Sequence, residues 1–314
     1  MRRITLSILL VFSISISYAQ RKQKEFTVMF YNVENLFDTE DHPDFADEEF
    51  TPEGSKKWDE KRYQKKLKDI TRVVLSLPGK ELPGIIGFAE IENEQVLKDL
   101  ASMRGLRGKG YEALVIEGDD PRGIDCGVLY RADIFKYKKH EMIPVEDLSG
   151  KEYRLRGILH VQGEGPDGRR LHIYVNHWKS RRGGVKETEH YRVYSAIALR
   201  RELDGLLSSE SEPRVIIMGD FNDEPTNRSM TEVLRAFNKR KNTWINDLYN
   251  LSYDVHNIGD EGSYNYQGVW QMYDQMIVSY SLLNQGRGLT AGFDSGKILK
   301  EEWMLYHDEK NNVK

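Results

Sequence analysis

The segment from Val215 to Asp223 constrains this chain more than any other. Four apolar residues of strand type, Val-Ile-Ile-Met, stop at Gly219, and Asp220, Asn222 and Asp223 follow within four residues. The pattern predicts a buried strand whose end carries hard oxygen ligands to the rim of a sheet. Asp220 and Asn222 are two positions apart, so in an extended backbone their side chains point the same way. That arrangement suits a divalent cation or a water molecule aimed at phosphorus, although Gly, Asp and Asn are also ordinary turn residues.

Residues 1–19 have the organisation of a secretory signal peptide. Two arginines open the segment, an apolar run extends from Ile4 to Ile16, and Ala19 precedes the expected cleavage site at Gln20. The alternative is a membrane anchor, but the run is short for a span of about 20 apolar residues and a highly charged segment follows it. We therefore expect a secreted or periplasmic protein with no stable membrane insertion, and no protein partner is indicated.

Charge and cysteine content exclude some classes of protein. Signal-peptide cleavage would remove two of 46 basic residues and none of 50 acidic ones, which moves the net charge from −4 to −6. A net negative charge argues against non-specific electrostatic binding of nucleic acid by the whole surface, but it is compatible with a locally basic cleft. Cys126 is the only cysteine, so no internal disulfide can form.

The mature chain, residues 20–314, has the length and patterning of one layered α/β domain. Runs of strand type are expected at 26–31, 85–89, 111–116, 125–130, 153–161, 170–176, 215–218, 263–266 and 272–279. Helical spacing is expected at 58–77, 93–103 and 186–207. The acidic stretch 38–57 contains prolines and a glycine and predicts an exposed loop.

Polar side chains follow or interrupt five of the predicted strands. They are Asn32 with Glu34 and Asn35, Glu90 with Glu92 and Asn93, Asn176 with His177, Asp220 with Asn222, and Tyr273 with Asp274 and Gln275. Each group alone is more often a cap or a turn, but ligands collect at such strand ends in α/β architectures. The chemistry indicated is hydrolysis at phosphorus, where a cation and hydrogen-bond donors stabilise negative charge spread over oxygens.

Individual residues in these groups suit that chemistry. Glu90 offers hard oxygens to Mg²⁺, Mn²⁺ or Ca²⁺, while the absence of a cysteine cluster disfavours zinc. His177 titrates near neutrality and can donate to a phosphoryl oxygen or a leaving group, although a structural histidine is the alternative. Lys179, Arg181 and Arg182 form a basic loop suited to phosphate, or else a solvated charged loop.

Four motifs in this order resemble the endonuclease/exonuclease/phosphatase superfamily, the fold of the DNase I-like nucleases. They are Tyr31 to Asn35, Phe88 to Asn93, Asn176 to Ser180, and Gly219 to Asp223. Order and spacing match from about residue 26 to residue 279, and the last two motifs are most similar to secreted bacterial nuclease-like members. The resemblance implies a four-layer sandwich of two face-to-face mixed β-sheets flanked by helices.

The resemblance also implies roles for the strand-end residues. Asn32 and Glu90 would coordinate the metal, which would be Mg²⁺ with Mn²⁺ or Ca²⁺ as alternatives. His177 would bind the scissile phosphate or assist the leaving group. Asp220 would orient or activate the attacking water, and Asn222 would help to hold the phosphate or the metal.

Further residues follow from the same likeness. Asp274 resembles the penultimate acidic motif of the family and is added to the catalytic set. The candidate phosphate or substrate contacts are Arg122, Asp125, Asn176, Lys179, Arg181 and Arg182. For Arg122 and Asp125, turn geometry and charge pairing explain the sequence nearly as well.

The chain departs from the family at its C-terminal end. Family members close with a strand preceded by a Ser-Asp-His motif, and nothing here matches it. The only histidine after Ser279 is His307, in a polar context. The chain is either a shortened enzyme without its last strand, an enzyme in which His307 has taken over the role, or a domain that keeps the fold without full activity. A missing last strand would leave a sheet edge unpaired.

The leading hypothesis is a secreted, Mg²⁺-dependent phosphodiesterase that cleaves nucleic acid by in-line attack of water. One alternative is a phospholipid or sugar-phosphate phosphatase, with lipid disfavoured because the 38–57 loop is acidic. Another is a binding module that holds a phosphorylated ligand without turnover. The aromatic residues Trp178, Tyr264, Tyr266 and Trp270 could stack on bases, or could serve only as packing.

Overall fold

The computed structural model describes residues 25–79, 81–151, 153–240, 246–259, 261–283 and 288–305. The expected signal peptide at 1–19 and His307 lie outside these ranges, so both remain predictions. Within the described residues, no helix is both long and apolar enough to cross a membrane.

The smaller of two main sheets has the strand order β1-β2-β4-β3. Its strands are β1 (Val28–Leu36), β2 (Ile85–Ile91), β3 (Tyr111–Val115) and β4 (Asp125–Arg131). β1 runs parallel to β2 and the other pairings are antiparallel, so the sheet is mixed. Among the described strands β1 pairs only with β2 and forms an edge of this sheet.

The larger sheet has the order β5-β6-β7-β8-β13-β10-β9. Its strands are β5 (Lys136–Ile143), β6 (Ile158–Glu164), β7 (Arg170–His177), β8 (Val215–Asp220), β9 (Ala236–Phe237), β10 (Leu248–Asn250) and β13 (Asp274–Ser279). β7 pairs with β8 in parallel, and β13 returns antiparallel to β8. A separate hairpin joins β11 (Tyr264–Tyr266) to β12 (Val269–Gln271).

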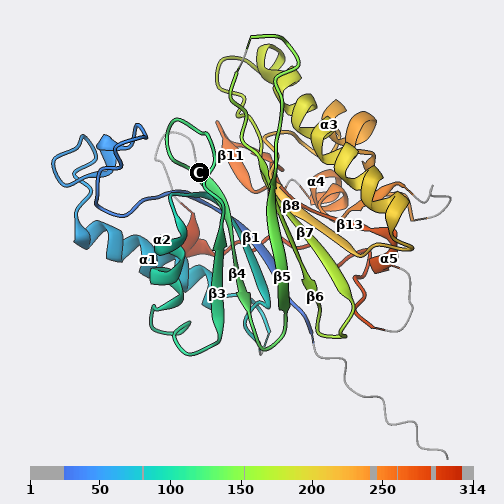
Figure 1. The fold of residues 1–314 in the computed structure, drawn as a ribbon, viewed down its shortest axis with the longest axis horizontal. Coiled ribbons are helices and arrows are strands. Elements are labelled where there is room, and N and C mark those ends of the chain that lie inside the picture. Colours follow the sequence, from blue (N-terminus) through green and yellow to red (C-terminus); the bar gives the residue numbers. More distant parts are fainter. Residues whose placement is uncertain are drawn as a thin grey trace, which may run out of the picture.

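Helices cover the outer faces of the two sheets (Figure 1). The helical segments are α1 (Glu60–Leu75), α2 (Glu94–Ala101), α3 (Val185–Ser209), α4 (Tyr253–Gly259), α5 (Tyr280–Leu283), η1 (Glu48–Phe50), η2 (Ser229–Leu234) and η3 (Glu302–Met304). One core fills the space between the sheets, a second lies between the smaller sheet and α1 with α2, and a third lies between the larger sheet and α3. The predicted layered sandwich is therefore confirmed.

Capping side chains explain where α1 and α2 begin. Asp59 accepts a hydrogen bond from the Arg62 backbone N–H at the start of α1, and Asn93 accepts one from the Val96 N–H at the start of α2. These contacts satisfy backbone donors that the first helical turn leaves free. Asn93, one of the strand-end residues, thus has a structural role.

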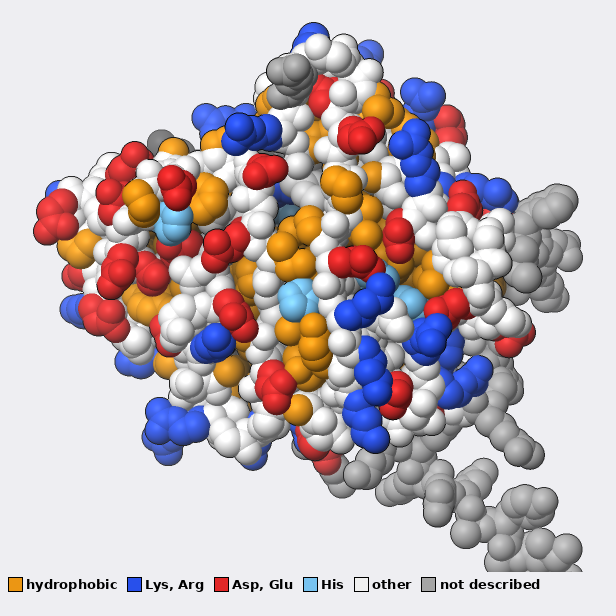
Figure 2. All heavy atoms as spheres, viewed as in Figure 1, with side chains coloured by type: hydrophobic (Ala, Val, Ile, Leu, Met, Phe, Trp, Pro, Cys, Tyr) orange, Lys and Arg blue, Asp and Glu red, His pale blue; other side chains and the backbone are white. Residues whose placement is uncertain are grey.

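The predicted elements differ from the structure in two places around β5 and β6. The strand expected at 153–161 begins only at Ile158, and residues 153–157 form a loop. β5 was not expected, because its sequence Lys-Tyr-Lys-Lys-His-Glu is highly charged. A strand at the edge of a sheet tolerates such side chains because one side of it faces water. The loop at 38–57 is largely exposed as predicted, and Figure 2 shows acidic side chains gathered over it.

Two buried histidines form an uncharged cluster on the larger sheet. His160 on β6 and His172 on β7 are joined by a hydrogen bond of 3.0 Å between Nε2 and Nδ1. Glu141 lies 3.2 Å from His160 Nδ1, and Glu210 lies 3.4 Å from His172 Nε2. Burial and the neighbouring His172 lower the pKa of His160 to about 4, and burial lowers that of His172. Both rings are therefore neutral at pH 7.

Lowering the pH from 7.5 to 4.5 is expected to destabilise the fold through His160. Its pKa is lower in the folded than in the unfolded chain, so its contribution is complete above about pH 6.5 and is lost as the pH falls toward 4. The full effect is on the order of 3 kcal/mol. Urea unfolding at both pH values would measure it, and His160→Gln should flatten the dependence. His140→Gln, on the edge strand β5, serves as the control. The assignment to His160 would be wrong if the free energy of unfolding of His160→Gln depended on pH as steeply as that of the wild type.

Candidate active site

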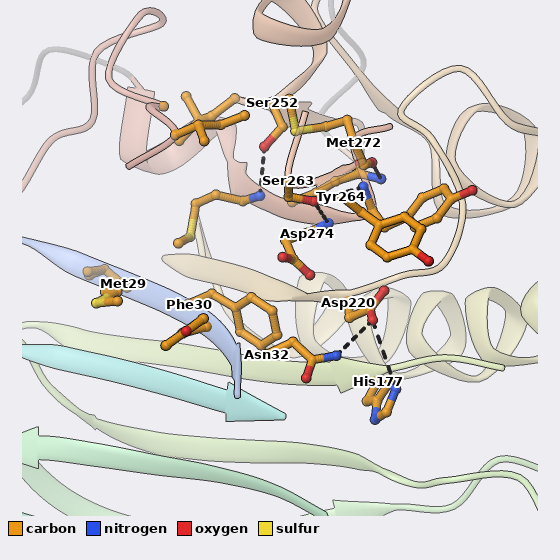
Figure 3. Close-up of a pocket in the computed structure, with 18 of the residues that line it drawn as sticks. Met29, Phe30, Asn32, His177, Asp220, Ser252, Ser263, Tyr264, Met272 and Asp274 are labelled. Atoms are coloured by element: carbon orange, nitrogen blue, oxygen red, sulfur yellow. Dashed lines mark hydrogen bonds and ion pairs between the residues drawn. The ribbon is translucent and has the colours of Figure 1, made fainter. Parts of the chain in front are cut away.

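A cavity of about 2640 Å³ runs beside β1 and the segment 288–305 and includes the place where the ends of β1, β2, β7 and β8 meet the start of β13 (Figure 3). All six residues predicted to be catalytic or metal-binding line it: Asn32, Glu90, His177, Asp220, Asn222 and Asp274. They come from five segments spread over more than 240 positions of sequence. Figure 3 shows Asn32, His177, Asp220 and Asp274 turned toward one another.

Strand register explains why these side chains meet. In the parallel pair β7 and β8, His177 lies opposite Asp220, and in the antiparallel pair β8 and β13, Asp220 lies opposite Asp274. Three neighbouring strands thus bring one functional residue each to the same level. β1 and β2 supply Asn32 and Glu90 from the facing sheet.

The backbone is unusual at two of these positions. Glu90 has φ 63° and Asn222 has φ 50°, in the left-handed region that costs a non-glycine residue on the order of 1 kcal/mol. At Glu90 the β1–β2 and β2–β4 pairings both shift register. The irregularity lies one residue before the last residue of β2, and the Glu90 side chain lines the cavity. Such strain is typical of functional sites.

Asn32 links the two acidic residues nearest to it. Its Nδ2 donates to Asp220 Oδ2 at 3.0 Å and lies 3.4 Å from Glu90 Oε1, while its Oδ1 accepts the Glu34 backbone N–H. His177 Nε2 lies 3.6 Å from Glu90 Oε1 and 4.0 Å from Asp220 Oδ2. His177 Nδ1 is buried and has no hydrogen-bond partner among the described residues.

The carboxyl groups of the site are crowded, and their protonation reflects it. Burial, with Glu90 nearby, raises the pKa of Asp220 to about 6. Burial and the Asp220 charge raise the pKa of Asp274 well above its usual range. Burial, with repulsion from Arg156, lowers the pKa of His177 well below its usual range. The site therefore combines a neutral imidazole with three carboxyl groups, of which Asp220 and Asp274 have raised pKa values.

The predicted phosphate contacts divide into two groups. Arg122, Lys179, Arg181 and Arg182 line the cavity, although the Arg181 guanidinium is already bonded to the Asn222 carbonyl, Asp223 and Asn227. Asn176 and Asp125 do not line it. Asn176 is buried and bonds to the Met218 carbonyl and the Trp178 indole, and Asp125 accepts the Gly118 N–H. The last two hold the backbone that carries the site.

Arg156 is a site residue that the sequence did not single out. Its guanidinium donates to the backbone carbonyls of His177 and Trp178 at 2.9 and 3.0 Å, and to Asp120 Oδ2 at 2.9 Å. It also lines the cavity. Nothing in the local sequence distinguishes Arg156 from Arg154, two positions earlier, which is exposed. Arg156 thus fixes the segment from which His177 projects.

Comparison with known proteins agrees with this geometry. The profile of the Endonuclease/Exonuclease/phosphatase family matches residues 27–313. The chain belongs to this family. Members of the endonuclease/exonuclease/phosphatase family are generally Mg²⁺-dependent phosphoesterases. No curated protein sequence matches the chain significantly.

Solved structures share the fold of the chain at low sequence identity. A mannosyl-6-phosphatase of Bacteroides thetaiotaomicron is 18% identical, with a TM-score of 0.52 over 81% of this chain and 85% of that one. A second protein from the same organism, described as an endonuclease/exonuclease/phosphatase family member, is 18% identical, with a TM-score of 0.52 over 81% and 83% of the two chains. A functionally unknown protein of Enterococcus faecalis is 12% identical, with a TM-score of 0.53 over 80% and 86%.

The site suits the divalent metal that the family implies. Three carboxyl groups share the cavity with a neutral histidine, and the pKa values of two of them, Asp220 and Asp274, are raised by burial and by the neighbouring carboxylates. Within the described ranges no three His, Cys, Asp or Glu side chains form a ready-made metal cluster. Mg²⁺ commonly takes only one or two carboxylates and keeps several waters, so this is compatible with its binding. Glu90 is the better supported ligand, because Asn32 turns its amide nitrogen toward the carboxylates.

Glu90→Gln is expected to change stability in opposite directions with and without metal. In EDTA the variant should melt higher than the wild type, because one of the charges that raises the pKa of Asp220 and Asp274 is gone. With Mg²⁺ the wild type should gain ~2.7 kcal/mol at 100 times Kd, and the variant should gain little. Thermal melts with Glu232→Gln as the control test this. Equal Mg²⁺ shifts in both proteins would refute Glu90 as a ligand.

Arg156→Lys should lower kcat about 10- to 100-fold, because lysine keeps the charge but cannot reach both carbonyls and Asp120 at once. The measurement is hydrolysis of bis-p-nitrophenyl phosphate, with the free energy of urea unfolding recorded alongside. Arg131→Lys is a matched control, since Arg131 is similarly enclosed and pairs with Asp133 and Glu81 away from the cavity. An equal loss in both variants would show that Arg156 has no special role in the site.

Proposed function

We propose that the chain is a divalent-cation-dependent phosphodiesterase whose substrate is nucleic acid. The observation that carries the proposal is the convergence of His177, Asp220, Asp274 and Glu90 in one cavity whose rim carries Arg122 and Lys179. Carboxylates at the centre and cations at the rim match a phosphoryl group flanked by further phosphates. A bound divalent cation would supply Lewis-acid stabilisation of the charge on the phosphoryl oxygens.

Asp220 is the proposed base. Its pKa of about 6 leaves it ionised at neutral pH and basic enough to take a proton from an attacking water. The Asn222 backbone N–H and Asn32 Nδ2 each donate to one of its oxygens, at 2.9 and 3.0 Å. These two contacts fix the carboxylate plane, and with it the direction from which the water is delivered.

Asp274 and His177 are proposed as donors. Burial and the Asp220 charge raise the pKa of Asp274 well above its usual range, which favours its protonated form and makes Asp274 the proposed donor and Asp220 the proposed base. The neutral His177 ring carries one N–H, and its Nε2 faces the carboxylate side of the cavity. Donation from Nε2 to a phosphoryl or leaving-group oxygen needs no prior protonation of the ring.

Arg122, Lys179 and Arg182 are proposed to hold the phosphates on either side of the scissile bond. Arg122 is half exposed at the mouth of the cavity, and the Lys179 ammonium lies 2.6 Å from the Tyr153 hydroxyl. Arg181 instead braces the loop, because its guanidinium is bonded to three groups of the protein. A charge-reversed Arg181 would therefore disturb the fold before it disturbed binding.

The secreted or periplasmic location remains a proposal that residues 1–19 support. N-terminal sequencing of the exported protein should give Gln20 as its first residue. An absent last strand or a role for His307 also remains a proposal. Turnover by residues 20–314, compared with the same chain carrying His307→Ala, separates these two readings.

The chain from Gln20 onward should cleave plasmid DNA or RNA in Mg²⁺ or Mn²⁺ and should stop in EDTA. His177→Ala and Glu90→Ala should each lower kcat at least about 100-fold, since a donor and a metal ligand are removed. Sphingomyelin, mannose 6-phosphate and bis-p-nitrophenyl phosphate are offered in parallel. Faster turnover of mannose 6-phosphate than of any diester would replace the proposal with a sugar-phosphate phosphatase. No turnover by a folded chain would favour a binding module.

A further inference from the structure

The β11–β12 hairpin stands at the mouth of the active-site cavity and is tied to it. Ser263, just before β11, accepts the backbone N–H groups of Tyr273 and Asp274 with its Oγ, at 3.2 and 2.8 Å. Figure 3 shows Ser263 and Tyr264 beside the Asp274 carboxyl group. The position of the hairpin is therefore coupled to one of the catalytic carboxyl groups.

Three tyrosines form a stacked ladder that leads from the outer surface to the site. The Tyr266 and Tyr264 rings are 6.5 Å apart and inclined by 12°, and the Tyr264 and Tyr273 rings are 5.7 Å apart and inclined by 22°. The Arg181 guanidinium lies 4.7 Å from the centre of the innermost ring. Tyr273 is 8% exposed, whereas Tyr264 and Tyr266 are 46% and 53% exposed. The inner end of the ladder is thus buried, and its outer end is exposed to solvent.

Packing explains Tyr273 but not the two outer rings. Neither Tyr264 nor Tyr266 belongs to any of the three cores, and both line the cavity. The apolar Val269 on the same hairpin is 61% exposed, so the hairpin buries little surface of its own. Exposed, parallel aromatic faces on the wall of a cavity are suited to binding a flat ring.

Acidic and basic side chains line the cavity in equal number, and the basic ones suit a ligand with several phosphates. Besides Arg122, Lys179 and Arg182, the wall includes Lys297 and Lys300 from the C-terminal segment. The Lys300 ammonium lies 4.2 Å from the centre of the Trp270 ring on β12. A single sugar phosphate would contact only some of these basic side chains. Aromatic rings between cations are the pattern of sites for single-stranded nucleic acid.

We infer that the Tyr264–Tyr266 ladder stacks on unpaired bases and makes the enzyme selective for single-stranded nucleic acid. This inference rests on the proposed phosphodiesterase function and names its substrate more narrowly. In a duplex, both faces of each base are covered by its neighbours, so the ladder has no free face to bind. In a single strand, an unpaired base can extend the stack at its exposed outer end, on Tyr266, which Tyr264 supports from behind. The contact is indifferent to base identity, because every base has a flat face.

The test compares three ligands of equal length: a single-stranded oligodeoxynucleotide, its duplex, and a strand with abasic sugars throughout. Wild-type protein should have a KM for the base-carrying strand about tenfold below that for the abasic strand or the duplex. Tyr264→Ala and Tyr266→Ala should raise the KM for the base-carrying strand about tenfold and leave the abasic strand unchanged. Tyr264→Phe, which keeps the ring, should behave like the wild type.

Val269→Ala is the matched control, because it removes an exposed side chain from the same hairpin without removing a ring. Fluorescence anisotropy of the three ligands in EDTA gives Kd values that do not depend on turnover. Equal affinity of wild type and Tyr264→Ala for the base-carrying strand would overturn the inference. Absence of hydrolysis of every ligand and of bis-p-nitrophenyl phosphate, with the base-dependent Kd difference intact, would instead overturn the proposed hydrolysis and leave the ladder as a binding site.

Discussion

The close parallel pairing of β7 with β8 is the constraint on which the site depends. It places His177 opposite Asp220, and it requires Gly219, where a Cβ would lie 2.3 Å from the Asn176 carbonyl oxygen. The Asn176 side chain then crosses to the Met218 carbonyl and locks the two strands at this level. Without this contact neither the histidine nor the aspartate would have a fixed partner, and Asp274 on the next strand would face a mobile neighbour.

The same closeness creates an electrostatic cost. Burial of Asp220 and Asp274 near Glu90 disfavours their ionised forms, and the nearest balancing charge, Arg156, is committed to backbone carbonyls and Asp120. A site that was optimised only for stability would replace one carboxyl group with an amide. All three carboxyl groups are nevertheless present, as expected of a site that binds a charged ligand at some cost in stability.

Strand ends and their polar neighbours are local features, so sequence patterns predicted the main helices and most strands and singled out six residues that line one cavity, whereas the arrangement in two sheets was expected from the family resemblance. They did not predict Arg156, since its role depends on where residues 153–157 cross the site rather than on its neighbours in sequence. Asn176 was expected to contact phosphate because it precedes His177, and Asp125 because its segment resembles one that borders the phosphate in the family. Both side chains are instead buried and bond to backbone groups, those of Met218 and Gly118. The short strands β9 and β10 have no pattern of their own and are held by partners distant in sequence, whereas β12 pairs locally with β11.

The proposed chemistry and the proposed selectivity belong to different parts of this fold. The proposed reacting groups come from the ends of long strands that are paired on both sides or pinned by hydrogen bonds, so their positions tolerate little change. The tyrosine ladder, Arg122 and Lys300 lie on loops and on a two-stranded hairpin outside both sheets. Replacement of those loops would alter the shape and charge of the cavity mouth without moving Asp220 or His177. This separation explains how one sandwich can serve phosphoesters as different as a sugar phosphate and a nucleic acid, and why a substrate must be inferred from the mouth of the cavity rather than from the fold.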